Sequence, residues 1–216
     1  PLLLDACDDN GDPSPFKIRG RIDRVDEVVL EPELRAKAIS DGVLSPNPIS
    51  HSMPLSHGPL PPANRLVVIR DLKTINGPKH GDKGNRHRRG IFDEVQLALY
   101  ARAWELQHPG DRVVGIGVTE IGESTIHYLE MDESVAEYLE HAELGERTSS
   151  SQQLHRFPDS ESSAHNGFRA LLAERLRTSS RAINAARNGH VNSTPGRHYS
   201  YSSIRHVYPT MFGGNS

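Results

Sequence analysis

Cysteine is almost missing from this chain, because Cys7 is the one example among 216 residues. A disulfide needs two cysteines and a thiolate metal site needs several, so the sequence excludes both within the chain. An apolar run long enough to span a bilayer is also lacking, and no secretory signal pattern is found. We therefore expect a cytoplasmic (intracellular) protein without a membrane partner.

An excess of positive charge is missing as well. Lys and Arg number 25 against 28 Asp and Glu, which gives a formal net charge of −3. This balance excludes a uniformly basic nucleic-acid coat but leaves room for a local basic patch. The P-loop pattern Gly-x-x-x-x-Gly-Lys-Ser/Thr does not occur, so the chain shows no helicase motif of that kind, and it has no internal repeat.

Length and composition indicate one domain. The 216 residues are 35% hydrophobic and include 18 Gly and 15 Pro, which suits a single core with polar insertions. We expect one α/β domain over residues 1–216, with its core at about 16–190 and an irregular tail at 191–216. The Pro- and Ser-rich stretch 31–64 predicts a mobile insertion with one helical turn near 32–39.

The stretch Leu66–Thr74 reads L-V-V-I-R-D-L-K-T and predicts a central β-strand. Side chains alternate along a strand, so Asp71 and Lys73 share one face at its end. A carboxylate that can hold a divalent cation would lie beside an ammonium that can orient or deprotonate a water. This combination is typical of a metal-dependent phosphodiesterase.

Earlier in the chain, Asn10-Gly11 is a strong turn signal. It predicts a hairpin between the strands 2–4 and 16–18. We expect the second strand to continue, slightly kinked, over the whole of 16–30.

Two acids, Asp23 and Asp26, lie in that apolar and basic stretch. Acids that become buried need partners or a metal. The alternative is that both form surface ion pairs with Arg21 and Arg24.

The stretch 76–90 follows the central strand and is strongly basic. Its position suggests contact with a nucleic-acid backbone, and a solvated loop is the alternative. The basic side chains are Lys79, Lys83, Arg86, Arg88 and Arg89.

The next stretch, 91–107, predicts a helix that stops at His108-Pro109-Gly110. Gln96 and Tyr100 lie four residues apart and so on one face of it. Alternatively, Tyr100 is a core aromatic and Gln96 a surface residue.

The C-terminal half predicts two strands, 112–119 and 124–131, joined as a hairpin. Asp132 is a fair N-cap for the helix that follows. The stretch 145–164 predicts a loop, and 165–188 a helix whose arginine-rich face is either solvated or turned toward DNA or a partner.

Three of these pieces together carry a resemblance to a known family. They are G-R-I-D-R-V-D at 20–26, I-R-D-L-K-T at 69–74 and Q-L-A-L-Y at 96–100. They are similar to the G-x-I-D-R-x-D strand, the D-x-K motif and the Q-x-x-x-Y helix of the RecB/AddB-type branch of the PD-(D/E)XK nucleases. The resemblance covers about residues 16–131 and implies a restriction-endonuclease-like core, with helices on both sides of a central mixed β-sheet.

The resemblance implies a role for each matching residue. Asp23 and Asp71 would hold Mg²⁺ or Mn²⁺, with the Leu72 carbonyl as a further oxygen ligand. Lys73 would position and help deprotonate the attacking water. Gln96 and Tyr100 would help hold the DNA strand, and Asp26 is a candidate for support behind the ligands.

The chain also departs from the family. Members usually have one more ligand, a Glu or His, on a helix before the first strand, and little sequence precedes Phe16 here. Because the chain begins at Pro1 without a methionine, we expect a fragment of a longer protein, with that ligand in a missing part, supplied from elsewhere or absent. The interval between Asp23 and Asp71 is long, which we attribute to the insertion at 31–64.

Some relatives carry a C-terminal cysteine cluster that binds an iron–sulfur cofactor. The matching stretch here, from Pro195 to His206, has no cysteine, so we expect no iron–sulfur cluster. His198 and His206 alone do not complete a zinc site.

We therefore expect a magnesium- or manganese-dependent deoxyribonuclease, acting as an exonuclease on single-stranded DNA or DNA ends in repair or recombination. A helicase is the expected partner or neighbouring domain. The alternatives are an inactive nuclease-fold module for DNA binding or assembly, and an RNA or tRNA nuclease of the same fold.

Overall fold

The computed structural model describes residues 1–55, 60–74, 95–121, 126–141, 153–156 and 167–190. Two compact units can be distinguished, Pro1–Ala182 and Ile183–Ser216. All of the described strands belong to the first unit, and the described part of the second is a helix end followed by a turn. Within the described residues, no helix combines the length and the apolar character needed to cross a membrane.

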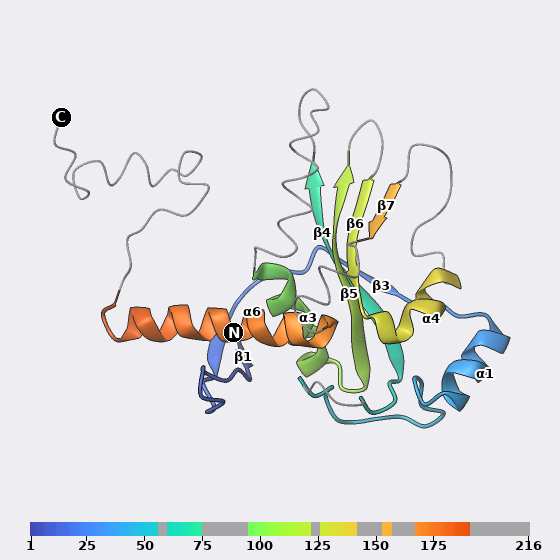
Figure 1. The fold of residues 1–216 in the computed structure, drawn as a ribbon, viewed down its shortest axis with the longest axis horizontal. Coiled ribbons are helices and arrows are strands. Elements are labelled where there is room, and N and C mark those ends of the chain that lie inside the picture. The colour runs from blue at the N-terminus through green and yellow to red at the C-terminus, as the bar shows by residue number, and fades with distance from the viewer. Residues whose placement is uncertain (56–59, 75–94, 122–125, 142–152, 157–166, 191–216) are drawn as a thin grey trace. The chain divides into compact units, whose positions relative to one another are not determined.

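The first unit is built on a five-stranded mixed sheet in the order β3-β4-β5-β6-β7 (Figure 1). Its two parallel pairs are β4 with β5 and β6 with β7, and its two antiparallel pairs are β3 with β4 and β5 with β6. The predicted mixed α/β class is thereby confirmed. The strands run over Arg24–Glu27 (β3), Arg65–Thr74 (β4), Asp111–Ile121 (β5), Ile126–Met131 (β6) and Gln153–Arg156 (β7).

The central strand β4 is buried on both faces. Leu66 and Val68 point into one apolar cluster, while Val67 and Ile69 point into another, and all four side chains are at most 2% exposed. A strand with a parallel neighbour and helices on both sides needs an uninterrupted apolar run, which this sequence supplies. The predicted strand at 66–74 is confirmed.

One face of the sheet is covered by α1 (Pro32–Ser40) and α4 (Ala136–His141). The Pro-rich stretch contributes Leu44, Met53 and Ala63 to the same cluster, each at most 3% exposed. The expected helical turn is thus a full helix, and much of the expected mobile insertion is part of the core. Single apolar residues separated by prolines gave no periodic signal for that packing.

The other face is covered by α3 (Gln96–Gln107) and α6 (Phe168–Arg187), which lie together on one side of the strands (Figure 1). Leu97, Ala98 and Ala101 of α3 pack in one cluster with α6. The predicted stop of α3 is confirmed, since the helix ends before His108. The beginning of the predicted helix, at 91–94, lies outside the described residues.

The predicted N-terminal hairpin is confirmed, with β1 (Leu2–Leu4) antiparallel to β2 (Phe16–Ile18). The expected continuous strand over 16–30 was wrong, because β2 and β3 belong to different sheets. The chain leaves one sheet and enters the other between Arg19 and Asp23.

The C-terminal half follows the prediction in outline. Strands β5 and β6 pair as expected, and the Asp132 side chain accepts the Ser134 amide at the start of a short 3-10 helix, Glu133–Val135 (η1), which leads into α4. The loop predicted for 145–164 was wrong in part, because β7 lies within it. Four residues without alternating apolar positions join the sheet through pairing with β6.

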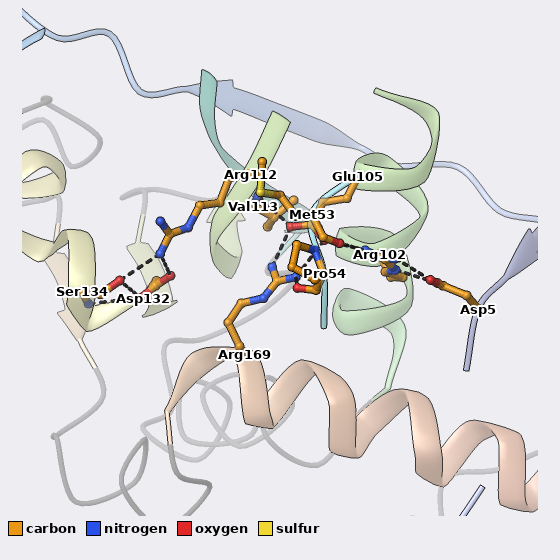
Figure 2. A network of polar contacts seen from close by, with 10 residues as sticks. All are labelled: Asp5, Met53, Pro54, Arg102, Glu105, Arg112, Val113, Asp132, Ser134 and Arg169. Atoms are coloured by element: carbon orange, nitrogen blue, oxygen red, sulfur yellow. Dashed lines mark hydrogen bonds and ion pairs between the residues drawn. The ribbon is translucent and has the colours of Figure 1, made fainter. Parts of the chain in front are cut away.

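A buried ionic network ties these elements together (Figure 2). Glu105 of α3 is fully buried, and its carboxylate accepts bonds from the Val113 amide of β5, from Arg102 and from Arg169 of α6. Arg102 also binds Asp5 and the Met53 carbonyl, and Arg169 binds the Pro54 carbonyl. Two cations and two carboxylates balance, which is the condition for keeping charges in a core.

The electrostatics of Arg102 follow from this arrangement. Burial lowers the pKa of its guanidinium, but hydrogen bonding to Asp5 and the charge of Glu105 more than offset burial, so the pKa is raised. Arg102 therefore stays charged and fastens the N-terminal hairpin to α3.

Candidate functional site

The end of β4 carries the two charged side chains that the sequence singled out. Asp71 and Lys73 continue the face of Val67 and Ile69, which is the face covered by α3. Asp71 is 7% exposed, and its Oδ2 lies 2.6 Å from Lys73 Nζ. The prediction that these two side chains share a face is confirmed.

Asp23 reaches the same strand end from the neighbouring chain segment. In the β3–β4 pairing Arg24 lies opposite Arg70 and Val25 opposite Ile69, so one further step of this register would set Asp23 opposite Asp71. The Asp23 Oδ2 accepts the backbone N–H of Leu72 at 3.1 Å. Asp23 thus lies where β3 stops, next to the Asp71–Lys73 pair.

Asp26 lies on the other face of the sheet. It is opposite Val68, which points into the cluster under α1 and α4. Its carboxylate pairs with Arg24 at 2.6 Å and with buried Arg70 at 2.7 Å, so the ion-pair interpretation holds for the Arg24 partner. Burial lowers the pKa of Arg70, and Asp26 counters that effect. Asp26 therefore supports the strand from behind and does not join the group around Asp71.

The helix α3 brings Gln96 and Tyr100 to the face of Asp71. Gln96 Nε2 donates to Tyr100 Oη at 3.0 Å, both side chains are half-buried, and Tyr100 packs against the cluster of Val67 and Ile69. The prediction that the two residues share a face is confirmed.

Gly20, at the start of the piece 20–26, packs against Tyr100 of the piece 96–100. A Cβ placed there would lie 2.9 Å from Tyr100 Cε1 and 3.3 Å from Tyr100 Oη. The segment before Asp23 thus passes close to this ring, and any side chain at position 20 would require the ring to shift.

The donor set suits a hard cation. Asp23 and Asp71 offer carboxylate oxygens at one strand end, and the Leu72 carbonyl faces the same strand edge as its N–H, toward Asp23. Mg²⁺ is commonly held by one or two carboxylates and keeps several waters. Across the residues that the structure describes, no group of three or more His, Cys, Asp or Glu side chains is close enough to hold a metal.

Several predicted residues lie outside the described part of the chain. These are the basic side chains of the stretch 76–90, namely Lys79, Lys83, Arg86, Arg88 and Arg89, and the histidines His198 and His206. Their predicted contact with DNA and the zinc alternative remain predictions.

Two rings near the site were missed by sequence reasoning. His108 was counted only as part of a helix stop and Trp104 was given no role, yet both line a cavity together with Tyr100. The spacing of Tyr100, Trp104 and His108 by four residues was the available signal, because such residues form one stripe on a helix.

Comparison of the chain with models of protein families, with curated proteins and with solved structures found no match.

Proposed function

We propose that this protein is a metal-dependent nuclease that hydrolyses DNA phosphodiester bonds at the end of β4. One observation carries the proposal: Asp23 binds the Leu72 amide immediately beside the Asp71–Lys73 pair. Two acids that are distant in the chain thereby share one strand end with an ammonium. The Gln96–Tyr100 pair on the same face gives further support.

The proposed chemistry assigns a task to each side chain. Asp23, Asp71 and the Leu72 carbonyl would hold Mg²⁺ or Mn²⁺, which when bound polarises a phosphoryl oxygen and acidifies a water. The Lys73 Nζ lies 2.6 Å from the Asp71 carboxylate at the same strand end. From there Lys73 would orient the attacking water and offset the negative charge that develops on the phosphate oxygens.

The reaction is an ordinary hydrolysis. The water oxygen forms a bond to phosphorus, the bond from phosphorus to the leaving oxygen breaks, and the leaving oxygen takes up a proton. Gln96 and Tyr100 would fix the strand so that attack and departure lie in line.

A second candidate function is a DNA-binding module of the same fold without activity. It is favoured by the absence of a third carboxylate or imidazole in the metal group, as far as the described residues go. It is disfavoured by Asp23, Asp71 and Lys73 all being present at one strand end.

The two functions are separated by incubating the protein with end-labelled single-stranded DNA and RNA in Mn²⁺ and, in parallel, in EDTA. We expect the DNA to be cleaved in Mn²⁺ and to stay intact in EDTA. Asp71→Asn and Lys73→Met should each lower the rate about a hundredfold or more. Faster cleavage of RNA than of DNA would assign the activity to an RNA nuclease.

The chain offers matched controls on the opposite face of the sheet. Lys37 and Asp41 form an exposed ion pair at 2.9 Å, so Lys37→Met and Asp41→Asn remove the same groups far from the proposed chemistry. Both should cleave at the unmodified rate. Intact DNA with every protein, together with retained DNA binding, would favour the inactive module.

A further inference from the structure

A cavity of about 460 Å³ opens between the N-terminal hairpin and α3. Its size falls within the range of small-molecule sites in proteins. One wall comes from β1 and β2 and the segment after them, through Leu2, Ile18 and Ile22, and the other comes from α3, through Ala103 and its neighbours.

The α3 wall is a stripe of rings. Tyr100 and Trp104 of α3, and His108 directly after the end of the helix, recur every four residues and all line the cavity. The Trp104 and His108 rings are stacked, with centroids 3.7 Å apart and planes inclined by 17°. The indole is also fixed at its edge, because Trp104 Nε1 donates to Asp111 at 3.0 Å. The Trp104 ring is therefore held in place by the His108 ring on one face and by Asp111 at its edge.

The other residues that line the cavity suit a ligand that combines a flat ring with a negatively charged group. Aliphatic Ile18 and Ile22 line the same cavity as the rings, and Arg19 brings a cation to it. None of the described residues that line it is acidic. A nucleobase attached to a sugar phosphate has both properties, since every base offers a π-face for stacking and every phosphate a charge for an arginine.

The cavity adjoins the proposed nuclease site. Tyr100 lines the cavity and also bonds to Gln96, Gly20 packs against Tyr100, and Ile22 directly precedes Asp23. A strand held at Asp71 therefore needs little length to place a neighbouring base among the rings.

We propose that this cavity binds one unpaired nucleobase of the nucleic-acid strand. The inference rests on the proposed function for its biological meaning, but the binding event needs neither metal nor catalysis. A base must leave its duplex partner to enter, so the cavity would make the protein select single strands or frayed ends.

The chain carries its own probe, because Trp104 is its single tryptophan. In EDTA, thymidine monophosphate should change Trp104 fluorescence in a saturable manner. Deoxyribose 5-phosphate, which lacks the base, should not. An equal response to both compounds would mean that only phosphate is recognised and would overturn the proposal, as would the absence of saturation.

Variants test the place of binding. Ala103→Phe fills the cavity and His108→Ala removes one ring of the stack, and each should weaken thymidine monophosphate and oligothymidylate binding about tenfold. The matched control His51→Ala changes an exposed histidine outside the lining and should bind as the unmodified protein does. Circular dichroism and urea unfolding establish that each variant is folded. Unchanged affinity in both folded cavity variants would refute the proposal.

The two proposals fail in distinguishable ways. Saturable base binding in EDTA without cleavage in Mn²⁺ would remove the nuclease function and leave the cavity. Cleavage in Mn²⁺ without base binding in EDTA would remove the base-binding cavity and leave the nuclease function.

Discussion

At the scale of single residues, one backbone amide explains the position of Asp23. Where β3 stops, the Leu72 N–H has no strand partner on that side, and the Asp23 carboxylate accepts it at 3.1 Å. An unpaired amide at a strand end is costly unless a side chain or water satisfies it. The same bond therefore finishes the sheet and brings a second acid to Asp71.

The closest contact near the site yields a test at the same scale. Gly20→Ala would place a Cβ 2.9 Å from the Tyr100 ring, so the ring must turn and its bond with Gln96 must break or lengthen. We expect a loss of stability of about 1 kcal/mol and a clear loss of nuclease rate. Urea unfolding and cleavage of labelled DNA measure the two effects.

A double-mutant cycle identifies the cause. If Gly20→Ala acts through the ring, it should have little further effect on the rate in a Tyr100→Ala background, because the atom it meets has gone. Additive losses of rate would show that the glycine matters for another reason.

Single residues also show what sequence reasoning can reach. Alternation along β4 was enough to place Asp71 and Lys73 on one face, and helical spacing was enough for Gln96 and Tyr100. Alternation along a strand also sets Asp23 and Asp26, three residues apart, on opposite faces, as they are in the structure. Local patterns could not show that the chain is interrupted near Gly20, because they predicted one continuous strand over 16–30. The contact that interrupts it, with Tyr100, is distant in sequence.

At the scale of elements, α3 has two different sides. Tyr100, Trp104 and His108 line the cavity, while Glu105 faces the core and holds Arg102 and Arg169. A buried carboxylate with two arginines joins α3 to α6 and, through the Val113 amide, to β5. The network thereby fixes the helix that presents the rings.

Removing that carboxylate tests how much the network matters. Glu105→Ala leaves Arg169 buried without its partner and should cost about 3–5 kcal/mol of unfolding free energy. The matched control is Glu174→Ala, which breaks the half-exposed Glu174–Arg177 pair and should cost at most about 1 kcal/mol. Urea unfolding followed by circular dichroism gives both values. Similar losses in the two variants would contradict a special role for the network.

The elements that sequence patterns missed have a common cause. Residues of β7 lack a period of their own and pair with β6, and the apolar residues of the Pro-rich stretch enter the core one at a time. Both depend on partners distant in the chain, which local periodicity does not register. By contrast, α6 and β4 carry long patterns and were predicted from them.

At the scale of the whole molecule, stability against acid depends on exposed carboxylates. Hydrogen bonding to Tyr138, and then to Lys37, holds the pKa of Asp41 below its ordinary value. Hydrogen bonding to Arg181 does the same for the pKa of Asp9, which links the N-terminal hairpin to α6. Their pairing joins segments that are far apart in the sequence.

The sign of the pH effect follows from these directions. Because both pKa values are lower in the folded state, the unfolded chain binds more protons in this range. The stabilisation is complete above the ordinary carboxyl pKa of about 4 and is lost as the pH falls through the folded values. Asp41→Asn should therefore lower the melting temperature at neutral pH and have little effect in strong acid. Thermal unfolding across the acid range would show this, and an equal effect at all pH values would contradict it.

The alternation of β4 has one more consequence, for its tolerance of changes in length. The strand separates two ion pairs: Arg70 pairs with Asp26 on one face of the sheet, and Asp71 pairs with Lys73 on the other. Deleting or inserting a single residue just after Ile69 would move each later side chain of the strand to the opposite face of the sheet. The number of residues in this strand is therefore as tightly constrained as their chemistry, and variation by insertion or deletion belongs in the turns that flank it.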